Sequence, residues 1–128
     1  MRERAALLRA IVEKSWGELE RAVLATPDGV VLAVSNSSDF DDVLAALSAA
    51  VVASVGEAFR LHLLLGVKDV AVELEDGRVV VMRDLGDAVL CLVSRPRPNL
   101  GLIRLLLDRY SERIPAGAES GSETAVKK

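Results

Sequence analysis

The stretch from Phe40 to Leu65 contains no proline and is predicted to form one long helix, opened by Ser38 and Asp39 and closed by Gly66. Asp39 is the predicted N-cap, because its short acidic side chain can accept a hydrogen bond from a free backbone N–H group of the first turn. Apolar residues recur at helical spacing along the stretch, as in a helix that lies on a sheet. The predicted sheet-facing stripe consists of Phe40, Leu44, Leu47, Val51, Val55, Ala58 and Leu65.

The remaining side of this helix is not polar, as the outer side of a solvated helix has to be. Charge returns only at Glu57 and Arg60. A helix that is apolar on all sides is buried on all sides. The residues of this second side are mostly small, namely Ala45, Ala46, Ala49, Ala50, Val52, Ala53 and Gly56.

Two environments can bury such a helix on all sides: a membrane or a second protein chain. A membrane span needs about 20 apolar residues, whereas the uncharged part of this helix covers only 43–56. The alternative is that the small residues let a second helix approach closely, most simply the same helix of another copy of the chain. The sequence therefore predicts a homodimer, with the small residues as the helical part of its interface.

The composition indicates a compact protein. A chain of 128 residues with 51% hydrophobic content suits a single domain, expected over 1–114, and the Gly- and Ser-rich residues 115–128 are predicted to be a disordered tail. A net charge of −3 argues against nucleic-acid binding, which needs a basic surface. The single Cys91 cannot pair within the chain, and with no signal peptide the protein is expected to be cytoplasmic.

Shorter segments surround the long helix. An amphipathic helix is predicted over 2–15, and a hairpin of two strands, 19–26 and 30–34, around a Pro-Asp-Gly turn. A last helix, capped by Asn99, is predicted to end before Pro115. Its predicted buried stripe consists of Leu102, Ile103, Leu106, Leu107 and Tyr110.

Three strands are predicted between the long helix and the last helix. The run 89–93 carries no charge and is expected at the centre of the sheet, buried on both faces. The run 68–75 alternates apolar and charged residues, as a peripheral strand does, and an Asp-Gly turn follows it. Its free edge is predicted to pair with a second copy. The interface residues predicted on this strand are Val70, Val72 and Leu74.

Side chains that catalyse reactions are scarce in this sequence. His62 is placed on the sheet-facing stripe and interpreted as a packed, hydrogen-bonded or partly exposed side chain, not as a ligand, and Cys91 lies in the most apolar strand, where a thiol stays protonated. The acids at 39, 41 and 42 are interpreted as charges that favour the helix dipole, not as a cation site. No glycine motif has the spacing of a phosphate loop. The sequence therefore predicts no catalytic residue, no metal site and no cofactor.

The order helix, hairpin, long helix, three strands, helix resembles the Roadblock (dynein light-chain) family over about 3–114. Three phrases carry the resemblance: Thr26-Pro-Asp-Gly-Val-Val-Leu-Ala in the hairpin, Leu44-Ala-Ala-Leu-Ser-Ala-Ala in the long helix, and Asn99-Leu-Gly-Leu-Ile-Arg at the last helix. The resemblance implies an α/β fold, α-β-β-α-β-β-β-α. It is a three-layer sandwich whose five-stranded, mainly antiparallel sheet has the long helix on one face and the two terminal helices on the other.

The resemblance also implies a function. Proteins similar to this one act with Ras-like small GTPases as activators, exchange-type regulators or platforms, and they form homodimers with one continuous sheet. The expected GTPase-binding residues are Glu57, Arg60 and Leu64, on the exposed side of the long helix. The alternatives are a small-molecule sensing module of GAF- or PAS-like architecture and an assembly scaffold without GTPase contact. The arginines weighed as arginine fingers, and interpreted as ordinary surface charges, are Arg60, Arg83, Arg95 and Arg97.

Overall fold

The computed structural model describes residues 2–114, and the predicted tail at 115–128 lies outside them. Three helices and five strands follow one another in the predicted order, α-β-β-α-β-β-β-α. The elements are α1 (Arg2–Lys14), β1 (Leu19–Ala25), β2 (Val31–Val34), α2 (Asp41–Leu63), β3 (Asp69–Glu73), β4 (Val79–Asp84), β5 (Val89–Ser94) and α3 (Leu100–Ser111).

The five strands form one antiparallel sheet in the order β2-β1-β5-β4-β3. The uncharged strand β5 lies at the centre and is buried along its whole length, as predicted. The strand β3 is an edge, which confirms the interpretation of its alternating charges. The tight turn at Gly77, where φ is +92°, fixes the register of β3 against β4 and places Asp69 opposite Arg83.

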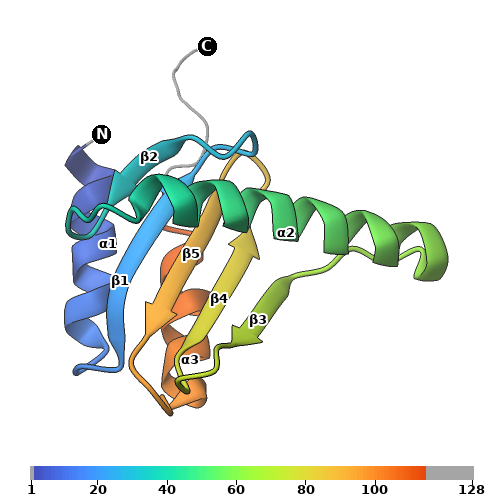
Figure 1. The fold of residues 1–128 in the computed structure, drawn as a ribbon. Coiled ribbons are helices and arrows are strands. Elements are labelled where there is room, and N and C mark those ends of the chain that lie inside the picture. The colour runs from blue at the N-terminus through green and yellow to red at the C-terminus, as the bar shows by residue number, and fades with distance from the viewer. Residues whose placement is uncertain (1, 115–128) are drawn as a thin grey trace.

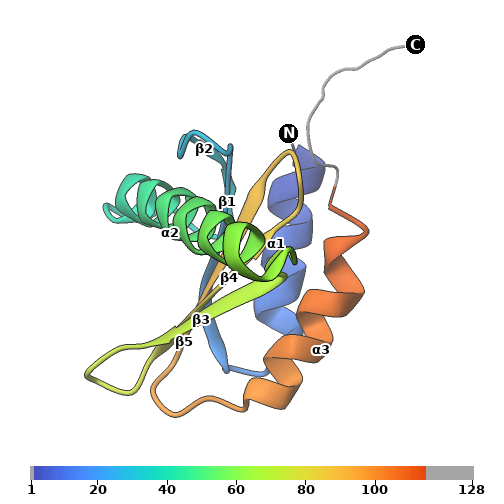
Figure 2. The ribbon, with the colours of Figure 1, turned by 90° about the vertical axis from the view of Figure 1, so that its right-hand side faces the viewer.

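The helices cover the sheet from both sides, in the predicted three layers. α2 crosses one face, and α1 and α3 lie together on the other (Figures 1 and 2). Each face has its own apolar core. The core under α1 and α3 includes Leu8, Ile11, Leu24, Leu90, Leu92, Ile103 and Leu107, and the core under α2 includes Val23, Ala25, Met82, Val89, Cys91 and Val93.

The start of α3 and the environment of Cys91 follow the sequence closely. The Oδ1 atom of Asn99 accepts a hydrogen bond from the backbone N–H of Leu102 at 3.1 Å, so Asn99 is the N-cap that its side chain predicted. Cys91 is a free, buried thiol, and burial raises its pKa above the ordinary value. It is a core residue, as predicted.

The two ends of α2 differ from the prediction. The helix begins at Asp41, and Asp39 does not cap it; the Asp41 carboxylate instead accepts a hydrogen bond from the N–H of Ser38 at 2.8 Å. At the other end Leu64, not Gly66, turns the chain, with a left-handed φ of +61° and its N–H bonded to the carbonyl of Arg60. The left-handed conformation costs a residue with a Cβ about 1–2 kcal/mol, which is why the pattern pointed to the glycine.

Candidate interaction surface

The side of α2 that faces the sheet is the small-residue side, so the predicted assignment of its two sides is wrong. The buried residues of the helix are Ala45, Ser48, Ala49 and Val52. Small side chains let the helix axis approach the sheet closely, and the larger residues are left outside. Ala45, Ala49 and Val52 are therefore covered by the protein's own sheet and leave no surface there for a second copy.

The large apolar residues that were expected on the sheet lie on the exposed side of α2. Phe40, Val43 and Leu47 are 68%, 52% and 56% exposed. Leu44 and Val51, on the flank between the two sides, are half-buried. The other small residues of the predicted interface, Ala46, Ala50, Ala53 and Gly56, are exposed or half-buried. A contact of these four with a second copy stays a prediction.

The last two turns of α2, residues 57–63, are exposed on all sides and are called the overhang from here on. Figure 1 shows this end of the helix extending beyond the edge strand β3. Phe59 and Leu63 continue the sheet-facing spacing of Ala45, Ala49 and Val52, but they are 47% and 59% exposed. The row of apolar residues that packs on the sheet therefore continues along α2 past β3, where residues 2–114 provide no further strand beneath it.

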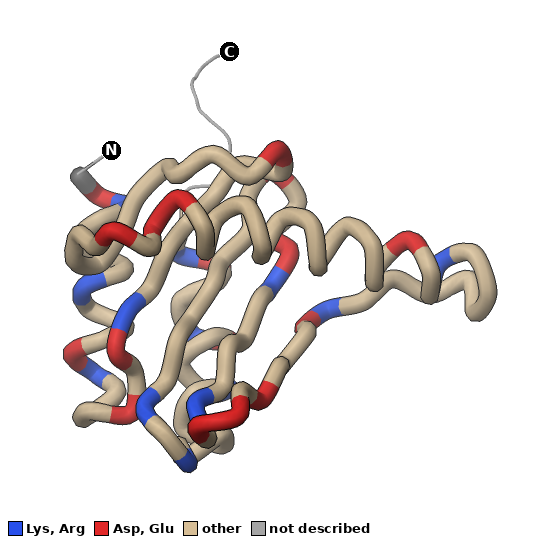
Figure 3. The backbone as a smooth tube through the Cα atoms, in the orientation of Figure 1, with Lys and Arg blue, Asp and Glu red and all other residues tan. Residues whose placement is uncertain are grey.

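Little charge interrupts this apolar surface. Figure 3 shows α2 without charged residues between its first turn and the overhang. By length and composition α2 is also the one helix of residues 2–114 that is long and apolar enough to cross a membrane. Its first half is packed on the sheet, so the exposed remainder is surface that another protein can cover.

His62 and the predicted GTPase-binding residues lie on or beside the overhang. His62 is exposed there, so its predicted place on the sheet-facing stripe is wrong, because the helix has already passed the sheet edge. Glu57 and Arg60, three residues apart, lie along one side of the helix end, and Leu64 follows as its left-handed C-cap; all three are exposed. Their role in binding a GTPase stays a prediction.

An open groove of about 240 Å³ lies beside α2 on the same face of the sheet. Its floor and walls are largely apolar, and Glu20, Arg21 and Arg78 bring charge to its lining. Sequence reasoning missed this groove, because periodicity does not tell how far a helix covers the sheet beneath it. The apolar residues that line it are Phe40, Val43, Leu44, Leu74, Val80 and Val93.

The outer edge of β3 is the third exposed feature of this surface. β3 pairs only with β4 in the sheet of residues 2–114, so the backbone groups of its outer edge have no strand partner there. Of the predicted interface residues, Val72 is exposed and Val70 is half-buried on this strand, and Leu74, also half-buried, follows its last residue. Ala71 and Glu73 are also exposed, so the edge is accessible.

The arginines considered as arginine fingers have different environments. Arg83 is 5% exposed, so its interpretation as surface charge is wrong. Its guanidinium bonds both carboxylate oxygens of Asp69, at 2.6 and 2.8 Å, and these bonds raise the pKa of Arg83. Arg95 is tied to Glu18 at 3.0 Å, whereas Arg60 and Arg97 are exposed and make no ion pair within residues 2–114.

Acidic side chains and thiols do not gather into a metal centre in the part of the chain described. No group of three or more His, Cys, Asp or Glu side chains within residues 2–114 has the arrangement that a metal ion needs. Asp41 is occupied by Arg21, at 3.1 Å, and by the N–H of Ser38. What the site offers is therefore an apolar helix side, a groove and a strand edge, which are the means of binding protein.

Comparison with known proteins places the chain in a family. Its sequence matches the Roadblock/LC7 domain over residues 5–94. The chain belongs to the Roadblock/LC7 family. This confirms the family resemblance of the sequence, and the matched region runs from α1 to the end of β5, so it includes α2 and the β3 edge. A comparison with curated proteins found no match.

Solved structures of Roadblock/LC7 and MglB proteins share the fold. The Roadblock/LC7 domain from Streptomyces avermitilis is 20% identical, with a TM-score of 0.78 over 86% of this chain and 92% of that one. MglB from Myxococcus xanthus is also 20% identical, with a TM-score of 0.75 over 87% and 84%. The gliding protein MglB from Thermus thermophilus is 24% identical, with a TM-score of 0.74 over 88% and 86%.

Proposed function

We propose that this Roadblock/LC7 chain is a homodimeric, non-catalytic regulator or platform for a Ras-like small GTPase. The observation that carries the proposal is the overhang of α2, whose sheet-facing stripe continues through Phe59 and Leu63 beyond the last strand of its own sheet. A helix side with this pattern needs a sheet beneath it. A second copy of the chain supplies one if its sheet continues from the edge of β3.

The free edge of β3 gives the way in which the two sheets join. Two β3 strands that pair antiparallel across a two-fold axis form one continuous sheet, with both α2 helices on the same face. Each overhang then lies over the partner's sheet. Val70 and Val72 belong to this strand and stay part of the proposed interface, as do the exposed small residues of α2.

The groove beside α2 is the complementary half of this contact. It is apolar, it opens on the face that carries α2, and its walls include Val43 and Leu44 of that helix. In a two-fold dimer the overhang of each copy occupies the groove of the other, so each contact occurs twice. This arrangement covers the exposed side chains of Phe40 and Val43, which a monomer would leave in water.

The proposed GTPase contact uses the side of the overhang that the dimer leaves free. Glu57 and Arg60 are exposed on the overhang, and the exposed Leu64 follows it directly. A two-fold dimer presents its helix pair once, across the axis, and a standard interface of ~1,600 Å² fits such a platform. One GTPase per dimer follows from this geometry.

The environments of the arginines reduce the candidates for an arginine finger to two, and the proposed platform mechanism uses neither as a finger. Arg83 is buried among carboxylates and Arg95 is held by Glu18, which leaves Arg60 and Arg97 free to reach a nucleotide. A finger contributes on the order of 10³-fold or more to the rate at full occupancy. Replacing either free arginine with alanine is expected to weaken binding and to leave stimulated hydrolysis intact at saturation.

Single-turnover GTP hydrolysis by the Ras-like GTPases of the same cell tests the proposal. The unmodified protein, Arg60→Ala and Arg97→Ala are each added at saturating concentration, with binding measured in parallel. Arg9→Ala is the matched control, because Arg9 is an exposed arginine of α1 on the opposite face of the sheet. A variant that binds fully but stimulates no hydrolysis refutes the platform mechanism. Failure of the unmodified protein to bind any of these GTPases refutes the function.

A further inference from the structure

Arg83 is the centre of a cluster that joins three elements on the α3 side of the sheet. From β4, its guanidinium donates hydrogen bonds to Asp69 of β3, to Asp108 of α3 at 2.9 Å and to the hydroxyl of Ser111 at 3.0 Å. The side chains of Arg83 and Asp69 are 7% and 8% exposed. Charge-assisted bonds with this fork geometry are stronger and more directional than ordinary hydrogen bonds.

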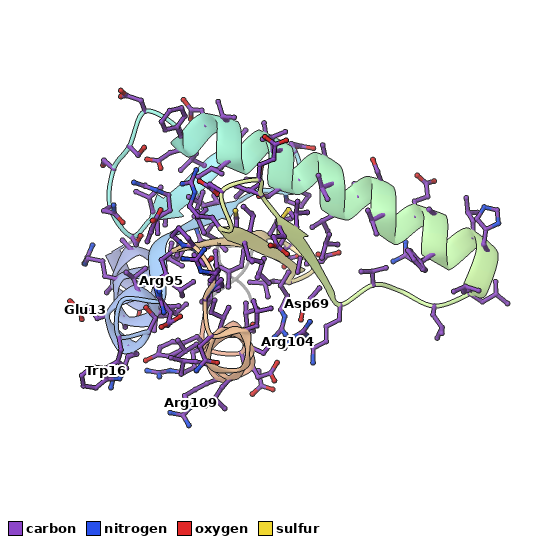
Figure 4. The ribbon with its side chains drawn as sticks, turned by 60° about the horizontal axis from the view of Figure 1, so that its bottom comes forward. Glu13, Trp16, Asp69, Arg95, Arg104 and Arg109 are labelled. Carbon is purple, nitrogen blue, oxygen red and sulfur yellow. The ribbon has the colours of Figure 1, made fainter. Side chains whose placement is uncertain are left out.

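Two further cations surround the carboxylates of this cluster. Arg104 approaches Asp69 and Lys68 approaches Asp108, each at 3.6 Å. Figure 4 shows Asp69 and Arg104 next to one another beside α3. Asp108 is 57% exposed, so one end of the cluster is buried at the strand and the other reaches the surface of α3.

Apart from its backbone pairing with β4, β3 has few side-chain contacts that hold it against the rest of the sheet. Its residues Ala71, Val72 and Glu73 are exposed, and only Val70 of this strand packs against the core under α2. An edge strand with so few apolar contacts opens easily by local unfolding. The bond between Asp69 and Arg83 lies at the first residue of the strand, directly after the connection from α2.

We propose that Arg83 is a positioning residue for self-association, which holds β3 in the extended, paired form that a second copy recognises. The inference rests on the proposed homodimer, in which β3 is the pairing edge. Without this tie the edge has to be ordered during association, and that ordering weakens the dimer. Because Asp108 completes the tie from α3, a change on the helix layer also affects the edge used for pairing.

The test uses hydrogen exchange of the peptide that covers β3, measured on dilute protein in which the protomer predominates. Arg83→Lys keeps the charge but cannot bond Asp69, Asp108 and Ser111 together, so exchange of β3 is expected to rise about tenfold, the effect of roughly one lost charge-assisted bond. Asp108→Asn removes only the exposed partner, and a rise of about threefold is expected. The dimer Kd, measured by dilution, is expected to rise with both changes.

Glu112→Gln is the matched control, since it removes one negative charge from an exposed residue immediately after α3. It is expected to leave both the exchange of β3 and the dimer Kd unchanged. The proposal is overturned if β3 exchanges at the unmodified rate in both Arg83→Lys and Asp108→Asn. It is also overturned if β1 and β5 accelerate as much as β3, because Arg83 would then serve general stability.

The outcome is separable from that of the proposed function. The exchange measurement contains no GTPase, so a protein that binds no GTPase can still show the expected rise in the exchange of β3. An unmodified protein that is monomeric at every concentration overturns the dimer and with it the role of Arg83 in self-association, whatever the exchange of β3 then is.

Discussion

Replacement of Phe59 by alanine is expected to weaken self-association strongly while leaving the protomer folded. Phe59 lies on the overhang, beyond the part of α2 that is buried on the sheet, and it is 47% exposed. Its ring is therefore available to a second copy and contributes little to the core of its own chain. The proposed dimer places the ring on the partner's sheet.

The exposed fraction sets the size of the effect. A phenylalanine offers about 200 Å² of surface, so roughly 90 Å² of Phe59 remains to be buried by a partner. At ~25 cal/mol per Å² this area corresponds to about 2 kcal/mol, of which alanine retains a part, so the loss is about 1.5 kcal/mol per copy. A two-fold dimer contains the contact twice, which gives about 3 kcal/mol and a rise in Kd of roughly 100-fold.

Sedimentation equilibrium over a dilution series measures this Kd, and circular dichroism checks the fold. Leu105→Ala is the matched control, because Leu105 is 53% exposed but lies on α3, on the opposite face of the sheet. The control is expected to dimerise like the unmodified protein. If Phe59→Ala dimerises as tightly as Leu105→Ala, the overhang does not contact a second copy and the reasoning from the continued stripe is refuted.

Three further changes test other parts of the structure. Ala49→Glu puts a carboxylate between α2 and its own sheet and is expected to destabilise the protomer by at least about 3 kcal/mol. Ala53→Glu, at an exposed position of the proposed interface, is expected to leave the thermal unfolding of dilute, monomeric protein nearly unchanged; equal melting temperatures of the two variants under these conditions would contradict the orientation of α2. Asn99→Ala removes the cap of α3 and is expected to cost about 1 kcal/mol in urea unfolding, while Asn99→Asp, which keeps an acceptor, restores most of it. The pKa of Glu18 is lowered by the hydrogen bond from the N–H of Asn99 and by Arg95, so the stabilisation from Glu18 is present above its ordinary pKa and is lost as the pH falls through the lowered value. Glu18→Gln is therefore expected to reduce the fall in melting temperature on acidification. A Glu18→Gln protein whose melting temperature falls as steeply below about pH 5 as that of the unmodified protein would contradict this.

The order and depth of the elements could be predicted from the sequence because they depend on local patterns. An uncharged run gives a central strand, alternating charge gives an edge strand, and Asn99 caps a helix by its own side chain. The family phrases add the arrangement of the layers. Each of these inferences uses residues that are close together in the chain.

The orientation of α2 could not be predicted in the same way. Its sequence has two apolar sides, one small and one large, and periodicity does not say which of them the sheet takes. The choice depends on how closely the helix approaches the strands, which is a property of the packed structure. The exposed side of Phe40, Val43 and Leu47 was therefore assigned to the core.

The burial of Arg83 could have been inferred. The turn at Asp76 and Gly77 sets the register of the hairpin, and that register places Asp69 directly across from Arg83. Opposite charges at such a position form a cross-strand pair. The contribution of Asp108 could not be found in this way, because it comes from a helix that the register does not place.

Both contact elements of the proposed dimer, α2 and β3, are consecutive in the chain and are joined by the short link at 64–68. The helix surface and the strand edge of the proposed contact therefore occupy one uninterrupted segment, residues 41–73, whereas the groove that receives the overhang and the tie through Arg83 use β1, β4, β5 and α3. Transplanting 41–73 alone between two members of the family would separate the overhang from the groove that it fits. A change of pairing partner therefore requires matched changes in both parts of the chain.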